Sequence, residues 1–282
     1  MKKIKLFILS ILIILNSATL IADDFNDWKV KFKKRAIKDG VSKTTVDKLI
    51  DRSKFLSDVI KYDRYQPEFY EDTKTYISKR TSSKKVKLGK IILNKENNII
   101  NKVSSEYKVD KNLLLALMGI ETNFGNYLGK MDIVSSLATL SYDQRRSEFF
   151  TKELITLLKL VDAKIIDPST LFGSWAGAFG NFQFMPSTIK NHAIDYNKDG
   201  SIDLKNIEDS FASAANYLSN LGWNDNTPCF YRINLNENIP DKYLNTSAKK
   251  IKHERKVKYL KNYIKNSSFL DKYDNLTAAI VT

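Results

Sequence analysis

The stretch that decides the fold runs from residue 113 to residue 125 and reads LLLALMGIETNFG. Its apolar run predicts a helix on which Leu114 and Met118 share a face with Glu121. Gly125 predicts that this helix ends soon after the glutamate. Burial and a helix C-terminus both disfavour negative charge, so we expect a raised pKa for Glu121, as a general acid near neutral pH requires. The alternative is a glutamate at a frayed helix end with its carboxylate in water.

Residues 1–22 are typical of a secretory signal peptide. Three lysines among the first five residues precede an apolar core over 6–15, and Ala18 and Ala22 are candidate cleavage points. We therefore expect a periplasmic protein, with an uncleaved N-terminus anchored in the inner membrane as the alternative. No cysteine lies near the cleavage point, so we do not expect a lipoprotein.

Composition and charge narrow the class of protein. The chain has 282 residues, 43% of them hydrophobic, enough for one large domain or two modest ones. The expected mature chain keeps a net charge of +11, because the signal holds three lysines and no acidic residue. Export makes nucleic acid an unexpected partner and favours the anionic partners found outside the inner membrane, which are cell-wall glycan-peptides and lipid surfaces. Cys229 is the single cysteine, so we expect neither an intrachain disulfide nor a catalytic thiol.

The region over 23–104 is helical in period. Phe25, Trp28 and Phe32 have the spacing of an amphipathic helix that Gly40 ends, and 42–50 predicts a second helix. The segment 81–85 is the expected interruption further on.

The rest of the chain divides by composition. Eight of the ten glycines lie between Gly119 and Gly222, so we expect the functional geometry within 105–225. In the C-terminal region, 226–282, Ile233 and Leu235 alternate as in a strand, and 249–264 predicts a basic helix.

Residues 173–188, GSWAGAFGNFQFMPST, combine small, aromatic and amide side chains. Small residues admit a sugar ring, aromatic faces stack on it, and Ser174 and Gln183 can bond its polar groups. The alternative is a packed turn before a helix that Pro186 opens. The adjacent Arg145 and Arg146 could place one guanidinium in a cleft, where it would bind a carboxylate of a wall glycan; the alternative is a surface pair.

The segment 195–203, DYNKDGSID, matches the first half of an EF-hand calcium loop. Asn206 stands where the closing glutamate is usual, but a longer loop could close through Asp209. The alternative is a simple turn between two elements. The candidate ligands are Asp195, Asn197, Asp199, Ser201 through its backbone carbonyl, and Asp209. Calcium here would be structural; no cofactor is expected for chemistry.

Six motifs occur in order along the chain: ETNFG at 121–125, SLATL at 136–140, RR at 145–146, GSWAGA at 173–178, QFMPS at 183–187 and ANYL at 215–218. With DRYQPEF at 63–69 upstream, the chain resembles the membrane-bound lytic transglycosylase B family of peptidoglycan-cleaving enzymes. The resemblance runs from about Phe25 to the end of the sequence.

The resemblance implies a mainly α fold, with a lysozyme-like catalytic core, a helical N-terminal region and a small β and EF-hand-like addition. It implies that Glu121 is the single catalytic acid and base, that the Asp195 loop is a calcium site, and that Asp209 is its last ligand. The residues that would hold the glycan are Arg146, Ser174, Gln183 and Tyr217.

The implied activity is cleavage between N-acetylmuramic acid and N-acetylglucosamine with formation of a 1,6-anhydro end. A lysozyme-type hydrolase is one alternative, and it needs a second carboxylate, for which Asp132 and Asp143 are weak candidates. Family members usually continue past the position of Thr282 with a helix and an asparagine that line the cleft. The expected truncation of 226–282 makes a catalytically weak peptidoglycan-binding protein the other alternative.

Overall fold

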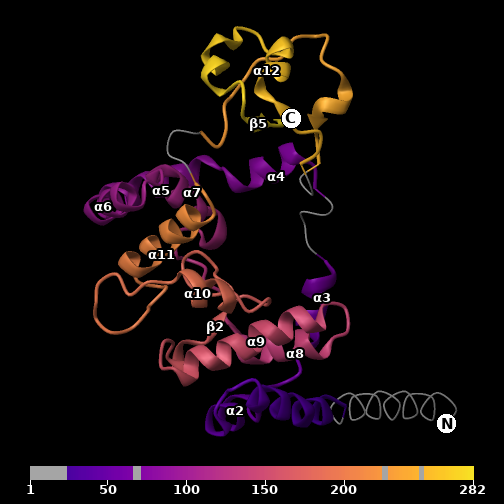
Figure 1. Cartoon of the computed structure of the whole chain (residues 1–282), viewed down its shortest axis with the longest axis vertical. Coiled ribbons are helices and arrows are strands. Elements are labelled where there is room, and N and C mark those ends of the chain that lie inside the picture. Colours follow the sequence, from indigo (N-terminus) through magenta and orange to yellow (C-terminus); the bar gives the residue numbers. More distant parts are fainter. Residues whose placement is uncertain (1–23, 66–70, 224–227, 248–250) are drawn as a thin grey trace, which may run out of the picture. The chain divides into compact units, whose positions relative to one another are not determined.

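The structure is a computed structural model that describes residues 24–65, 71–223, 228–247 and 251–282. The chain divides into two compact units: unit 1 comprises the residues up to Arg64 and Lys95–Trp223, and unit 2 comprises Tyr65–Asn94 and Asn224–Thr282 (Figure 1). Helices dominate both sequence halves, which confirms the mainly α fold class. The expected signal peptide lies outside the described residues, and within the described ranges no helix is long and apolar enough to cross a membrane.

Unit 1 holds the longer helices. Its described elements are a helix over 24–38, α2 Lys43–Ile50, α3 Ser57–Arg64, α6 Asn97–Tyr107, α7 Lys111–Thr122, β1 Met131–Asp132, α8 Ile133–Tyr142, α9 Ser147–Asp162, the 3₁₀ helix η2 Pro168–Thr170, β2 Phe172–Gly173, α10 Pro186–His192 and α11 Ile207–Asn220. The strands β1 and β2 pair antiparallel, with Met131 opposite Gly173.

Helix α8 forms the centre of unit 1. Nine of its ten residues are buried, all but Tyr142, so it is surrounded by protein on nearly every side. It packs against α9, whose apolar face buries residues from Phe150 to Leu160, and α2 and α3 pack on the same pair (Figure 1). Small residues such as Ser136 and Ala138 let these neighbours approach the α8 backbone closely.

The N-terminal helices follow the predicted pattern. Phe25, Phe32 and Ala36 are buried, Gly40 takes a left-handed φ of 95°, and Ser42 caps α2 by accepting a hydrogen bond from Thr45 N. The predicted interruption at 81–85 is also confirmed, since α4 ends at Arg80 and α5 begins at Ser83.

The compact units divide the chain differently from the expected boundaries at residues 104 and 225. The N-terminal helices belong with the core because the segment between α2 and α3 is bonded to α8: Lys54 N donates to Ser135 Oγ at 3.0 Å and Leu56 N donates to Thr139 Oγ1 at 3.0 Å. These partners lie about 80 residues apart, so no local pattern reveals them.

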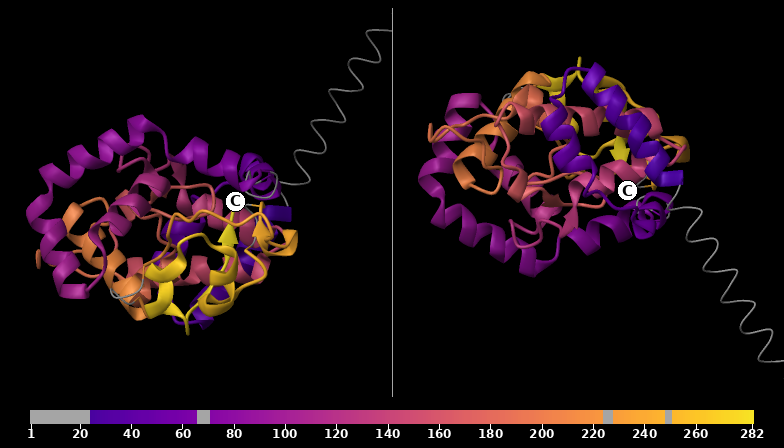
Figure 2. Two further views of the ribbon diagram at one scale, coloured as in Figure 1. Left: turned by 90° about the horizontal axis from the view of Figure 1, so that it is seen from above. Right: turned by 90° about the horizontal axis from the view of Figure 1, so that it is seen from below.

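Unit 2 joins two distant segments into a smaller core. Its described elements are α4 Thr73–Arg80, α5 Ser83–Lys95 with its last residue in unit 1, η3 Asp241–Tyr243, β3 Leu244–Asn245, β4 Arg255–Lys256, α12 Val257–Leu260, η4 Lys261–Tyr263, η5 Ser267–Tyr273, β5 Thr277–Ala278 and β6 Ile280–Val281. Strands β3 and β6 pair parallel, and β4 pairs antiparallel with β5. Figure 2 shows the C-terminal segment of unit 2 in yellow, with the C-terminus marked. The buried core side chains are Val257, Leu260, Ile264, Leu270, Tyr273 and Ile280.

Two sequence predictions for the C-terminal region are wrong. Ile233 and Leu235 do not form a strand; Leu235 makes only an isolated bridge to Ile264. The predicted basic helix over 249–264 shrinks to α12 and the 3₁₀ helix η4 that follows it, and residues 249 and 250 lie outside the described part. Here β4 pairs with β5 and Val257 N donates to Leu276 O, so contacts with the chain end replace a local helical repeat.

Candidate active site

Helix α7 brings Glu121 to the edge of unit 1. Asp110 caps its N-terminus by accepting hydrogen bonds from Asn112 N and Leu113 N, and the helix ends one residue after the glutamate, at Thr122. Three consecutive residues then adopt left-handed backbone, Asn123, Phe124 and Gly125, with φ of 50°, 60° and 78°. Two of these are not glycine, and such strain tends to persist at functional sites.

Part of the Glu121 side chain reaches solvent, yet the protein around it desolvates the carboxylate enough to raise its pKa above the usual value. Desolvation is the cause, and among the described residues no hydrogen bond or ion pair holds the charged form. The expectation of a raised pKa is therefore met. A carboxyl group in this state can keep its proton closer to neutral pH and donate it to a bound substrate.

Thr122 and Asn181 join the end of α7 to the loop over 173–183. Thr122 Oγ1 lies 2.8 Å from the Asn181 carbonyl and accepts a hydrogen bond from Gly125 N at 3.0 Å. The Asn181 amide, in a side chain only 2% exposed, donates to Lys205 O at 3.0 Å and Ser210 Oγ at 2.9 Å. One buried asparagine thus links α7, the loop and α11. Nothing in the local sequence indicates a role for Asn181, because only its burial in the fold distinguishes it.

The loop over 173–183 approaches the chain that follows α7 very closely. A Cβ on Gly129 would lie 2.1 Å from Gly173 O, so the two backbones are in direct contact. Ser174 Oγ accepts from Ala178 N at 3.0 Å, which leaves its proton available to a ligand. Gln183, with a left-handed φ of 51°, donates through Nε2 to Gly180 O at 3.0 Å and to Leu128 O at 3.4 Å. No described residue donates to its Oε1, which remains an acceptor.

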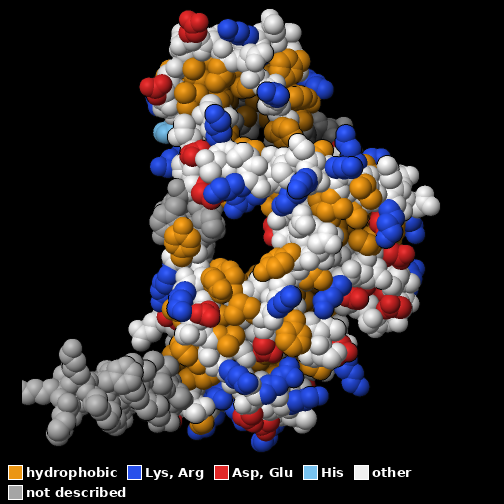
Figure 3. All heavy atoms as spheres, turned by 180° about the vertical axis from the view of Figure 1, so that it is seen from behind, with side chains coloured by type: hydrophobic (Ala, Val, Ile, Leu, Met, Phe, Trp, Pro, Cys, Tyr) orange, Lys and Arg blue, Asp and Glu red, His pale blue; other side chains and the backbone are white. Residues whose placement is uncertain are grey.

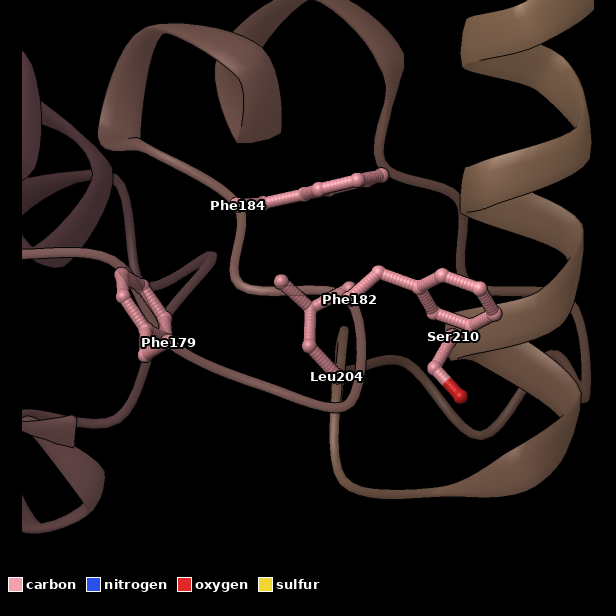
Figure 4. Close-up of a pocket in the computed structure, with 5 residues that line it drawn as sticks. All are labelled: Phe179, Phe182, Phe184, Leu204 and Ser210. Atoms are coloured by element: carbon pink, nitrogen blue, oxygen red, sulfur yellow. The ribbon is translucent and has the colours of Figure 1, made fainter. Parts of the chain in front are cut away.

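Tyr217 lies on α11 against the same loop. Its ring centroid is 5.6 Å from that of Phe184 and 5.1 Å from that of His192, in edge-to-face contacts that fix the ring plane. A neighbouring apolar pocket is a packed core rather than a ligand site, since it has no room for a water molecule. In Figure 4 the Phe182 ring reaches from the loop toward the helix that carries Ser210. The residues that line it are Phe179, Phe182, Phe184, Leu204 and Ser210.

Arg146 lies in a different cluster, around Asp63. This aspartate is 1% exposed and pairs with three arginines: Arg145 Nε at 2.8 Å, Arg64 Nη1 at 3.0 Å and Arg146. Arg146 also places its guanidinium 4.8 Å from the Phe150 ring centroid. Arg146 contacts Asp63 and Phe150 rather than the loop beside Glu121, so its role in holding glycan stays a prediction. Asp63 itself was missed, although an acid before Arg64 was a visible signal.

The two weak candidates for a second carboxylate both have structural partners. Asp132 caps α8 by accepting from Ser135 N at 2.7 Å. Asp143 receives both terminal nitrogens of Arg64, at 2.8 and 3.1 Å, and this hydrogen bonding lowers its pKa. Both carboxylates are therefore engaged in structural contacts within unit 1.

The predicted calcium loop is closed by hydrogen bonds. Asp195 accepts from Asp199 N and Gly200 N at 3.1 and 2.8 Å, and Asn197 Nδ2 donates to Asp199 at 2.9 Å. Asp209 is fully buried and accepts from the backbone of Tyr196, Asn197 and Asp203. The oxygen donors suit calcium. Within the described ranges, however, no three His, Cys, Asp or Glu side chains gather as a metal cluster, so an ion would compete with these hydrogen bonds.

Nearly the whole described chain matches one known protein family. The family described as "Transglycosylase SLT domain" matches residues 24–278. The chain belongs to this transglycosylase SLT family. The match includes α7 with Glu121, the glycine-rich loop and α11, and it confirms the family suggested by the six motifs.

Relatives within the transglycosylase SLT family agree. The membrane-bound lytic murein transglycosylase B of Escherichia coli K12 is 38% identical over 149 residues, which are 52% of this chain and 41% of that protein. The chain thus matches less than half the length of this curated relative. SltB3 of Pseudomonas aeruginosa, solved with NAG-NAM-pentapeptide, superposes with a TM-score of 0.81 at 28% identity, over 92% of this chain and 69% of that one. Escherichia coli Slt35, solved in complex with calcium, superposes with a TM-score of 0.73 at 26% sequence identity. The superposition covers 89% of this chain and 78% of Slt35. These matches confirm the lysozyme-like fold class.

Proposed function

We propose that this protein is a lytic transglycosylase that cleaves the β-1,4 bond between N-acetylmuramic acid and N-acetylglucosamine in peptidoglycan. The observation that carries the proposal is Glu121: a carboxyl group with a raised pKa, at the end of α7, in a chain that belongs to the transglycosylase SLT family. The complex of SltB3 with NAG-NAM-pentapeptide supports the substrate class.

In the proposed reaction Glu121 acts first as acid and then as base. The protonated carboxyl gives its proton to the glycosidic oxygen, and the bond from that oxygen to C1 of the muramic sugar breaks. The C6 hydroxyl of the same sugar then attacks C1 and passes its proton to the Glu121 carboxylate. No water enters, so the reaction needs no second carboxylate, consistent with the structural partners of Asp132 and Asp143.

The loop and α11 would supply the substrate contacts. Ser174 Oγ is free to donate and Gln183 Oε1 to accept, which suits hydroxyl or acetamido groups of the glycan. Tyr217 offers an oriented phenol beside them. Arg146 would contact the glycan through the exposed part of its guanidinium group, because the rest of that group is paired with Asp63. We further propose that Asp195, Asn197, Asp199, Ser201 and Asp209 bind a structural calcium ion, supported by the calcium complex of Slt35.

The proposed location is the periplasm, where peptidoglycan lies, with residues 1–22 as an export signal or, uncleaved, as a membrane anchor.

Digestion of purified sacculi in ¹⁸O-labelled water tests the reaction type. Transglycosylation should release unlabelled anhydro ends, lighter by one water than reducing ends, because the attacking oxygen belongs to the sugar. Labelled reducing ends would identify a hydrolase and refute the proposal. Binding to sacculi without release of fragments would identify a wall-binding protein and refute it equally.

A further inference from the structure

The net positive charge of the chain is concentrated in unit 2. Its two segments, 65–94 and 224–282, contain 18 Lys and Arg against 9 Asp and Glu, a net charge of +9 out of +14 for the whole chain. The larger unit 1 carries the remaining +5, of which three charges are the lysines among its first five residues. Such asymmetry between parts of one chain is typical of a surface that meets an anionic partner.

Unit 2 also exposes aromatic side chains, two of which are in contact. Phe230 is 82% exposed, and Tyr231 and Phe269 are each 43% exposed. The rings of Tyr231 and Phe269 lie 5.3 Å apart, centroid to centroid, and Tyr231 follows Phe230 directly. We call these three residues the aromatic patch. Phenylalanine has no polar atom, so such exposure in water is unfavourable and marks an interaction site when residues gather.

Cations flank the aromatic patch. Tyr231 Oη lies 3.1 Å from Tyr273 Oη, and Lys272 places its ammonium 4.9 Å from the Tyr273 ring centroid. The backbone of Lys258 lies beside this segment, since its N donates to Asp274 O, one residue beyond Tyr273, and Lys256 is two residues before Lys258.

These cations are not neutralised. Lys256, Lys258 and Lys272 are exposed and form no ion pair within the described part of the chain. Lys261, by contrast, binds Asp271 and Asp274. In Figure 3 hydrophobic side chains reach the surface of unit 2 among Lys and Arg side chains. The cationic groups are therefore available to an external anion.

We propose that unit 2 docks on an anionic phospholipid surface, with the lysines on the headgroup phosphates and the aromatic patch in the interfacial layer. Lysine stems can lie along apolar surface while their ammonium groups stay at the headgroups. A sugar ring could stack on one face of Phe230 or Phe269, but only an apolar layer would remove a ring as exposed as that of Phe230 wholly from water, so we favour lipid and make binding to sacculi an outcome of the test. The docking is separate from any anchor in residues 1–22 and independent of the proposed catalysis.

Sedimentation with lipid vesicles tests the docking. The chain from Asp23 onward, without the expected signal, should bind vesicles that contain phosphatidylglycerol and should not bind phosphatidylcholine alone. The triple variant Lys256→Glu, Lys258→Glu and Lys272→Glu should bind at least about tenfold more weakly, because each lysine near a charged membrane contributes about fivefold. The double variant Phe230→Ser and Phe269→Ser should lose about tenfold or more through the apolar contribution.

A matched control separates docking from net charge. Lys31, Lys34 and Lys38 are exposed on the helix over 24–38 in unit 1, and reversing all three changes the net charge equally. This variant should keep vesicle binding, and every variant should keep the wild-type melting temperature. Equal weakening by both triple variants would overturn the proposal, as would equal binding to both kinds of vesicle. Loss of sacculus binding with unchanged vesicle binding would assign the surface to the cell wall instead.

Discussion

Glu121 combines partial solvent access with a desolvated carboxylate, and this combination follows from its place at the end of α7. Leu114 and Met118 on the same helix face are buried, while the helix stops one residue later. Phe124 turns back over Gly119, where a Cβ would lie 2.6 Å from the ring. The glutamate thus follows a buried apolar helix face, while a substrate can still reach its exposed side chain.

The raised pKa of Glu121 predicts how pH changes stability. A group with a raised folded-state pKa contributes stability below its unfolded pKa and loses it as pH rises through the folded value. Glu121→Gln should therefore become increasingly more stable than the wild type as pH rises from below about 4.3 towards neutrality. Urea unfolding across this range measures the difference.

Glu148→Gln is the matched control, because Arg35 hydrogen-bonds the Glu148 carboxylate and lowers its pKa. Its difference from the wild type should have the opposite sign and stay small, since the pair is exposed. A Glu121→Gln difference that does not change with pH would contradict the desolvated site.

At this scale the sequence predicted the apolar spacing around Glu121 and the early end of its helix, because both are local patterns. The sequence could not predict the hydrogen bonds of Thr122 with Asn181 and of Arg145 with Asp63. These partners lie 59 and 82 residues apart along the chain and meet only in the folded protein.

Among the elements, the contact between the chain after α7 and β2 positions the site. Gly129→Ala would force a Cβ against Gly173 O at 2.1 Å and place alanine at a left-handed φ of 85°. We expect a loss of about 2–5 kcal/mol in unfolding free energy, from backbone strain plus overpacking. Urea unfolding measures it.

Gly40→Ala provides the comparison, since Gly40 has a similar φ of 95° but nothing within 4 Å of an added Cβ. It should lose only about 1–2 kcal/mol, the strain alone. Equal losses for the two variants would show that the contact with Gly173 is not tight.

The loop before α11 predicts a response to calcium. Calcium that binds only the folded state should raise the melting temperature, with about 2.7 kcal/mol of stabilisation at a hundredfold excess over the dissociation constant. Asp199→Asn should reduce this shift, whereas Asp27→Asn, which changes an exposed aspartate on the helix over 24–38, should keep it. A melting temperature that EDTA leaves unchanged in calcium-supplemented protein would argue against the site.

For the elements, periodicity predicted the helices of unit 1 well because their apolar faces repeat regularly. It failed over 249–264, where the lysine-rich sequence has helical spacing but pairing of β4 with β5 determines the backbone. Short strands paired with distant partners leave little trace in local sequence.

At the scale of the whole molecule, the candidate catalytic residue and most of the net charge lie in different units. Unit 1 contains Glu121 and all the candidate glycan contacts, while unit 2 carries most of the net charge. The sequence showed the change in composition after Trp223, but not that 65–94 joins the C-terminal segment, because that depends on pairings such as Thr73 N with Thr246 O.

The central claim is that Glu121 alone performs acid and base catalysis. Sacculi should be digested with the wild type, Glu121→Gln and the control Glu208→Gln, and the products analysed by mass spectrometry. We predict anhydro-ended fragments from the wild type and the control. Glu121→Gln should release at least about a hundredfold fewer such fragments. At acidic pH this variant should keep the melting temperature of the wild type, which would show that it is folded. Wild-type amounts of anhydro fragments from Glu121→Gln would contradict the account.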